Sequence, residues 1–358
     1  MKKFQYGGQA VMEGVMMRGK DSTTISVRKP TGDIVVSERK NNKSGKKPAF
    51  HNWPIIRGVI NFVASMVVGI ESLMYSANQV TDEEEEKLTA TEISLTLVVS
   101  LVLFIGIFIV LPNLVVAFLT KNVASAVVVN LIEGLLRITI FLIYLFAMSK
   151  VKDIQRVFQY HGAEHKSIAA WEAGEELTVD NARKYTRFHP RCGTNFLLIV
   201  MVVSILMFSM LGKQTIFMRL LTRILLLPVV AGVSYEVLKF AGAHSSNKIV
   251  ACAIWPGLML QKLTTGEPDD SQLEVALVSL RSVIANDKAF EEDENTVSLG
   301  EKIVRFENGE VVEVVEKVET TEEVVADEVI EEVCVDEAVE ENIEAVDSQE
   351  QTSEEESN

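Results

Sequence analysis

The feature that most constrains this chain is a run of 28 residues without a charged side chain, from Ile93 to Thr120. About 20 apolar residues in a helix cross the hydrocarbon core of a bilayer, so this run is long enough to span a membrane. Similar apolar stretches occupy residues 130–148, 192–212 and 224–243. The sequence therefore predicts an α-helical integral membrane protein with about four transmembrane helices.

The 130–148 stretch contains two charged residues, Glu133 and Arg137. They lie four positions apart, so they can pair on one face of the helix instead of entering lipid alone. The pair is therefore compatible with a membrane span.

Two further apolar stretches are less regular. Residues 55–80 are interrupted by Arg57 and Glu71, and residues 249–261 contain Pro256-Gly257 at their middle. Uninterrupted apolar runs of about 10–14 residues are too short to cross a bilayer. We therefore expect both stretches to be interfacial or re-entrant helices.

Lysine and arginine are concentrated on one side of the predicted spans. The 150–195 loop has eight of these residues and the first 57 residues have twelve, whereas the 121–129 link has one and the 213–223 link has three. Basic loops stay in the cytoplasm, which places both termini there, in a multi-pass protein of the cell membrane. A fifth span at 55–80 would move the 150–195 loop outside, so we exclude it. The N-terminus lacks the apolar core of a signal peptide, and we expect no export.

The net charge of -16 is unevenly distributed, because residues 291–358 have 26 acidic and 3 basic side chains. Glutamate alternates with valine there, which predicts a disordered acidic tail. We divide the chain into an N-terminal cytoplasmic segment (1–50), a membrane domain (51–285) with a cytoplasmic histidine-rich loop (150–194), and the tail (286–358). Three cysteines at unrelated spacings predict no disulfide framework.

Two cytoplasmic elements have clear local signals. Residues 23–28 and 33–37 flank a Lys-Pro-Thr-Gly-Asp turn, which predicts a β-hairpin next to the glycine-rich motif of residues 7–19. Ser271 and Glu274 form a capping-box pattern that predicts the start of an amphipathic helix. The apolar stripe of that helix would be Leu273, Leu277, Leu280 and Ile284.

The sharpest chemical signal is His161-Gly-Ala-Glu-His165. Two histidines four residues apart share a helix face and can hold one divalent ion, with Glu164 beside it as a catalytic base, in the H-x-x-E-H order of inverzincin peptidases. The alternative is a polar helix start whose histidines bond to the backbone or to lipid headgroups.

Three more residues can complete a metal site, because each lies at the cytoplasmic end of a predicted span: His189, Cys192 and His244. Two histidines plus one of these would leave a coordination position open for water, as in catalytic zinc sites. We therefore expect a divalent metal, zinc by its ligand types. Cys192 could equally be a small buried residue at a helix start.

Two other patterns favour structural roles. Residues 14–20 resemble a phosphate-binding loop, but Asp21 replaces the metal-binding hydroxyl and a predicted strand follows where a helix is required. We expect the glycines to permit tight turns and no nucleotide to bind. The acidic residues of 267–270 suit the start of the predicted helix.

Four motifs together resemble the YqhQ-like family of bacterial membrane proteins, a family of unknown function described as predicted metal-dependent enzymes. The motifs are GGQAVMEGVMMRG (7–19), YHGAEHK (160–166), HPRCGTNF (189–196) and EPDDSQLEVA (267–276). The resemblance covers roughly residues 4–285 and implies a bacterial inner or plasma membrane protein. His161, Glu164, His165, His189 and Cys192 lie inside the family motifs.

These observations predict a cytoplasm-facing, metal-dependent hydrolase in which Glu164 is the general base. The alternative is a non-enzymatic assembly or scaffolding factor whose basic face binds membrane lipid, the ribosome or protein partners. No feature predicts specific nucleic-acid binding. A transporter is disfavoured, because the sequence shows no repeated pair of broken helices.

Overall fold

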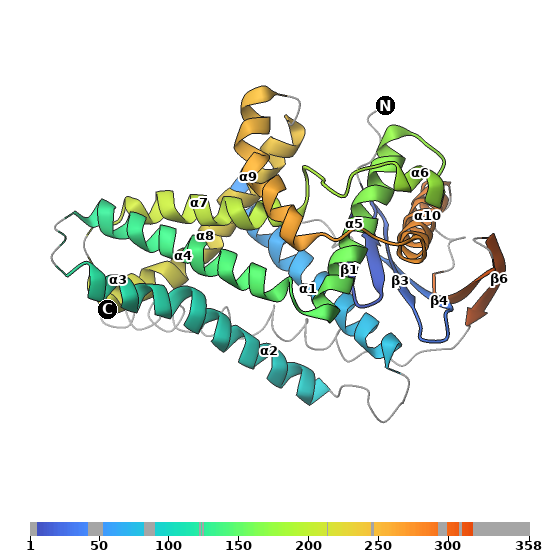
Figure 1. Ribbon diagram of the computed structural model, residues 1–358, viewed down its shortest axis with the longest axis horizontal. Helices are drawn as coiled ribbons and strands as arrows, with labels where there is room; N and C mark the ends of the chain where they lie inside the picture. The colour runs from blue at the N-terminus through green and yellow to red at the C-terminus, as the bar shows by residue number, and fades with distance from the viewer. Residues whose placement is uncertain are drawn as a thin grey trace, which may run out of the picture. The chain divides into compact units, whose positions relative to one another are not determined.

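A computed structural model of the chain describes residues 6–41, 53–81, 90–121, 123, 125–212, 214–244, 247–292, 299–307 and 310–317. Within these ranges the chain is mostly helical, with one six-stranded antiparallel sheet (Figure 1). Four of the helices are long and apolar enough to cross a membrane. The prediction of a helical fold with about four such helices and a small N-terminal β region is confirmed.

The sheet has its strands in chain order. They are β1 (Gly7–Val11), β2 (Gly14–Arg18), β3 (Ser22–Arg28), β4 (Ile34–Lys40), β5 (Glu301–Glu307) and β6 (Glu310–Lys317). Strands β3 and β4 form the predicted hairpin, with Val27 opposite Val35. The glycine-rich motif forms a second hairpin, β1–β2, that was not predicted as strands. Its two-residue turn places Glu13 at a φ of 49°.

The prediction of a disordered tail is wrong for two segments. Residues 286–292 continue a helix, and residues 301–307 and 310–317 form β5 and β6. Strand β5 pairs with β4, with Val304 opposite Ile34, and Val304 is buried in the core. The edge of β4 supplies backbone partners and an apolar surface that the segment lacks by itself, which is why local composition missed it. The rest of that prediction, from residue 318 onward, lies outside the described residues.

Helices cover both faces of the sheet (Figure 1). Val15 and Met17 of β2 pack with α5 (Lys152–Ala173), the short α6 (Val179–Arg183) and α10 (Asp270–Glu292). Met16, between them in sequence, faces the other side, in a cluster with Val68 of α1 (Pro54–Val80). This alternation follows from the two-residue repeat of a β-strand.

Helix α10 confirms the predicted apolar stripe, because all four of its members are buried. The reciprocal capping pair is Asp269 and Gln272 and not Ser271 and Glu274. The Asp269 carboxylate accepts from the Gln272 N–H at 2.9 Å, and the Gln272 side chain accepts from the Asp269 N–H at 3.0 Å. The helix therefore begins close to the predicted position with a different pair of caps.

The apolar helices depart from the predicted spans in two ways. The apolar helices are α1, α4 (Ala126–Met148), α7 (Gly193–Ser209), α8 (Ile216–Ala243) and α9 (Lys248–Thr264). A further continuous helical run consists of α2 (Ala90–Ile105), the π-helical segment η3 (Gly106–Val110) and α3 (Leu111–Leu119). Helix α7, predicted as a full span, has 17 residues, near the lower limit for crossing. Helix α1, whose charges were expected to interrupt it, is continuous and qualifies by length and apolarity.

The second half of α1 nevertheless bonds to the sheet. Tyr75 donates to Glu301 at 2.9 Å, and the Ser76 hydroxyl accepts from the Met12 N–H at 3.1 Å. Gln9 donates to the Gly69 carbonyl at 3.4 Å. One side of the second half of α1 therefore makes polar contacts with the sheet.

The predicted Glu133–Arg137 pair forms within α4, at 2.7 Å. Arg223 of α8 joins it: its Nε donates to the same carboxylate at 2.6 Å, and its Nη2 donates to the Asn130 side-chain oxygen at 3.2 Å. Glu133 and Arg223 are both buried. This cluster connects two of the membrane-length helices, and its third member was not predicted.

Candidate metal centre

Helix α5 presents both histidines of the H-x-x-E-H motif with one ring nitrogen already engaged. The His161 Nδ1–H donates to the carbonyl of Thr264 at 2.8 Å, and the His165 Nδ1–H donates to the carbonyl of Arg187 at 2.5 Å. A neutral imidazole that donates from Nδ1 keeps its lone pair on Nε2. Histidines that bind metals are almost always held in this way by a second partner.

Cys192 completes a group of three. Its Sγ lies 3.2 Å from the His161 Nε2, and ligand atoms of His161, His165 and Cys192 all lie within 4.8 Å of one another. In a tetrahedral zinc site, bonds of about 2.0–2.3 Å put neighbouring ligand atoms roughly 3.3–3.8 Å apart. The donor types suit zinc, and the three residues lie close enough together to belong to one site. Cys192 is also the cap residue of α7, since its Sγ accepts from the Thr194 N–H.

Glycine inside the motif permits the approach that orients His161. A Cβ on Gly162 would lie 2.1 Å from the carbonyl oxygen of Gly266, in the link between α9 and α10. The Gly266 N–H in turn donates to the Phe158 carbonyl at 2.6 Å. Only a residue without a side chain lets α5 come this close, which brings the Thr264 carbonyl to His161.

The loop that carries Cys192 is held by Gln261 of α9, a fully buried residue. Its side chain accepts from the His189 N–H at 2.9 Å and donates to the His189 carbonyl at 2.8 Å. Asn195 donates to the Pro190 carbonyl at 2.6 Å. Sequence reasoning missed Gln261, Thr264 and Arg187 as supporting residues. Their contributions depend on tertiary contacts. The spacing of side chains in the sequence does not indicate which backbone carbonyls will accept hydrogen bonds.

The other two candidate ligands are placed differently. The His189 ring lies 5.5 Å from that of His165, but its Nε2 faces Glu172 at 3.5 Å. Burial lowers the pKa of His189, an effect opposed by the charge of Glu164. His244 is exposed and stacks on Phe240. The structure therefore places His189 beside the group and does not bring His244 to it.

Glu164, the candidate base, is buried next to the three ligands. Its Oε2 lies 3.4 Å from the His165 Nε2. Strand β1 packs over it at Gly8, where a Cβ would lie 2.7 Å from the Glu164 Cγ. The carboxylate is thus held at the group and shielded from bulk solvent.

Comparison with known proteins gives the family. Residues 53–286 match the model of a family described as a protein of unknown function (DUF1385). The chain belongs to the DUF1385 family. It is 32% identical over 292 residues to the uncharacterized protein YqhQ of Bacillus subtilis (strain 168), covering 78% of this chain and 92% of that protein. No solved structure matches it.

The part of the chain that matches DUF1385 contains the complete candidate centre. The three grouped ligands, Glu164 and the supporting residues all lie between residues 53 and 286. All six strands lie outside that range. The helical part alone therefore defines the DUF1385 match.

Two other motifs have structural partners in this DUF1385 protein. Glu267 pairs with Lys166, and Asp270 pairs with Arg183 at 2.6 Å, so these acids hold α10 against its neighbours. In the loop that resembles a phosphate-binding loop, the N–H groups of residues 20, 21 and 22 donate to Asp287 at 2.7–3.1 Å. The loop does bind an anion, but the anion is a carboxylate of the same chain.

Proposed function

We propose that this protein is a membrane-bound, metal-dependent hydrolase. The observation that supports it is the geometry of the two histidines. Each is oriented by a backbone carbonyl, the His161 Nε2 lies 3.2 Å from the Cys192 Sγ, and His165 belongs to the same group. Imidazole nitrogen and thiolate sulfur are the ligands that zinc prefers. Three protein ligands leave a fourth position open, as catalytic zinc sites do.

In this proposal Glu164 is the residue that handles the proton. A bound zinc ion would supply Lewis acidity and lower the pKa of a water molecule at the open position. The Glu164 carboxylate lies 3.4 Å from the His165 Nε2 and would accept the proton as a general base. Strand β1 at Gly8 limits access of bulk water to the same carboxylate.

The second candidate is a structural metal in a non-enzymatic assembly factor that binds lipid, the ribosome or protein partners. It is favoured by the burial of His165 and Cys192 and by the segments that meet at the group. The ligands come from α5 and the start of α7, and the carbonyls that orient the histidines come from α9 and the loop before Cys192. An ion there would lock these segments together whether or not it catalyses a reaction.

For the membrane topology we propose that α2–α3, α4, α7 and α8 cross the bilayer and that α1 lies at its cytoplasmic surface. Both termini would then be cytoplasmic, in the cell membrane of a bacterium. The contacts of α1 support this placement, because its second half bonds to strands that also carry charged side chains. Those strands cannot enter hydrocarbon, so the same half of α1 cannot cross it.

The experiment measures bound metal and function in the same variants. Wild-type protein, purified in detergent without chelator, should carry about one zinc per chain, as a single site of this type requires. Changing His161 and His165 together to Ala should remove the metal, whereas Glu164→Gln should keep it and fail to complement a deletion strain. His244→Ala is the matched control and should behave like wild type.

The outcomes separate the two candidates. Loss of function with full metal content in Glu164→Gln supports the hydrolase. A metal-bound protein that functions fully as Glu164→Gln supports the structural site. A wild type without metal removes both forms of the proposal.

A further inference from the structure

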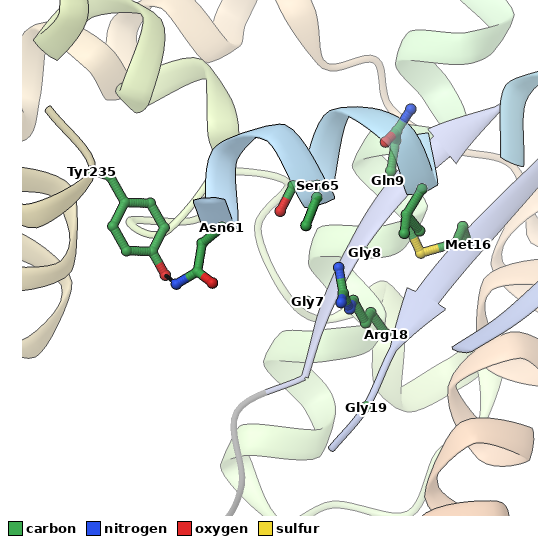
Figure 2. Close-up of a pocket in the computed structure, with 11 residues that line it drawn as sticks. Gly7, Gly8, Gln9, Met16, Arg18, Gly19, Asn61, Ser65 and Tyr235 are labelled. Carbon is green, nitrogen blue, oxygen red and sulfur yellow. Dashed lines mark hydrogen bonds between the residues drawn. The ribbon is translucent and has the colours of Figure 1, made fainter. Parts of the chain in front are cut away.

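A cavity lies outside the candidate metal centre, between the β1–β2 hairpin and helices α1 and α8 (Figure 2). Its volume is about 480 Å³. The residues that define its chemistry are Gly7, Gly8, Arg18, Asn61, Ser65 and Tyr235. None of the proposed metal ligands lines it, so it needs an explanation of its own.

Arg18 is the charged residue of this cavity. Its side chain is half-buried, and no hydrogen bond or ion pair joins it to another residue in the described part of the chain. Two other half-buried arginines are paired: Arg28 with Glu274 at 3.0 Å and Arg57 with Glu236 at 2.6 Å. Partial burial of a guanidinium without an acceptor is costly, so a ligand that supplies an acceptor would bind favourably here.

The remaining polar groups also offer donors. Asn61 donates to the Tyr235 hydroxyl oxygen at 3.1 Å, which leaves the phenolic proton free to donate elsewhere. Figure 2 shows the Arg18 guanidinium beside Gly7 and Gly8, across from Asn61 and Ser65 on α1. No acidic side chain is among the described residues that line the cavity. The cavity is therefore suited to an anion.

The position of the cavity indicates how that anion is presented. Two of its walls are α1 and α8, both long and apolar enough for a membrane, and Ala64 and Val68 of α1 add apolar lining. Val63 and Met66, on the uncovered face of α1, are about half exposed, at 52% and 50%. A ligand with a charged head and an apolar tail fits such a boundary.

We propose that this cavity binds a phosphate group, and specifically the headgroup phosphate of an anionic phospholipid. Arg18 would engage the phosphate oxygens with two parallel N–H bonds, the arrangement that guanidinium and phosphate favour. The Tyr235 and Ser65 hydroxyls would donate to the remaining headgroup oxygens. The missing side chain at position 7 leaves space for the headgroup beside the strand.

Lipid binding to the full-length protein tests the proposal. Delipidated protein in a neutral detergent is titrated with phosphatidylglycerol or with phosphatidylcholine of the same chains, and bound lipid is counted by native mass spectrometry. Wild type should prefer phosphatidylglycerol, and Arg18→Gln should weaken that binding about tenfold or more, as expected for lost charge-assisted hydrogen bonds. Lys29→Gln removes an equal charge from the β3–β4 turn and should have no effect.

Gly7→Leu provides an independent variant. A Cβ at Gly7 would meet no atom within 4 Å, so the substitution should occupy the cavity beside Arg18, the residue opposite it on β2, without removing the guanidinium. It should reduce the preference as Arg18→Gln does. The double His161 and His165 variant should keep the preference, so this proposal and the metal proposal can fail separately.

A parallel titration with inorganic phosphate identifies the source of the anion. Arg18-dependent binding of inorganic phosphate without a lipid preference supports the phosphate pocket and overturns the lipid as its ligand. Equal binding of both lipids by wild type and Arg18→Gln, with no Arg18-dependent phosphate binding, overturns the proposal entirely.

Discussion

At the scale of single residues, two adjacent glycines of β1 differ in how much space a side chain would have. A Cβ on Gly8 would lie 2.7 Å from the Glu164 Cγ and 2.8 Å from the Met16 carbonyl oxygen, whereas one on Gly7 would meet nothing within 4 Å. The sequence motif presents these residues as equivalent. Only the packing of β1 on α5 shows that one of them is required at the candidate centre.

We predict that Gly8→Ala destabilises the protein and that Gly7→Ala does not. Forcing a methyl group into a filled site costs about 1–3 kcal/mol, and here one neighbour is backbone that cannot move aside. Thermal unfolding of the two purified variants in the same detergent measures the difference. Equal melting temperatures would show that β1 does not pack on Glu164 as described.

A second residue-scale prediction concerns Asp287. Its carboxylate accepts three backbone N–H groups from residues 20–22 and the Ser22 hydroxyl at 2.9 Å. Asp287→Ala would leave buried donors without partners, at about 1–3 kcal/mol for each. The free energy of unfolding should fall by several times the change seen for Asp153→Ala, an exposed position at the start of α5. Similar losses in both variants would contradict this role.

At the scale of helices and strands, sequence patterns predicted what local periodicity determines. The β3–β4 hairpin, the buried stripe of α10 and the α4 ion pair were all recoverable from spacing within one segment. The features that the sequence patterns did not predict depend on contacts with a second segment of the chain. Strand β5 forms because the edge of β4 is available, and Arg223 reaches Glu133 from a helix 90 positions away. Histidine spacing likewise predicted the pair on α5, but not the carbonyls that orient it.

The cluster of Glu133, Arg137 and Arg223 gives the element-scale prediction. Glu133→Gln would leave two buried guanidinium groups without their counter-charge, and breaking a buried pair in this way costs about 3–5 kcal/mol. Glu236→Gln is the matched control, since its pair with Arg57 is partly exposed and such pairs contribute about 0–1 kcal/mol. Thermal unfolding in detergent should show a large loss only for Glu133→Gln, and equal losses would argue against a buried cluster.

At the scale of the whole molecule, the sheet joins the two ends of the described chain. Strands β5 and β6 extend the N-terminal strands, so the acidic C-terminal region is part of the fold as far as Lys317. The membrane-length helices lie between these ends in sequence. Truncating the chain and mapping its membrane topology therefore both test the arrangement of the whole molecule.

We predict that a chain ending at Lys317 keeps wild-type stability, whereas one ending at Gly300 does not. The shorter chain loses the strand that pairs with β4 and the buried Val304, and it exposes the backbone of β4 as a free edge. The measurements are the melting temperature and the fraction of aggregated protein after purification. If the chain ending at Gly300 matches the longer one in both, β5 adds nothing to the fold.

Single introduced cysteines test the proposed topology in a background where Cys252 and Cys334 are serine and the buried Cys192 is kept. With α2–α3, α4, α7 and α8 as the spans, positions Lys121 and Gln214 are outside the cell and Glu175 is inside, because basic loops remain in the cytoplasm. Gln79, near the end of α1, should share the inside location, since α1 bonds to the sheet along its second half. Labelling of intact cells with a membrane-impermeant maleimide should therefore modify the first two positions only. If α1 crosses the bilayer and the N-terminus stays inside, Gln79 and Glu175 would be labelled, and Lys121 and Gln214 would not. Labelling at Glu175 would place the candidate metal centre on the outer face and overturn the cytoplasmic site.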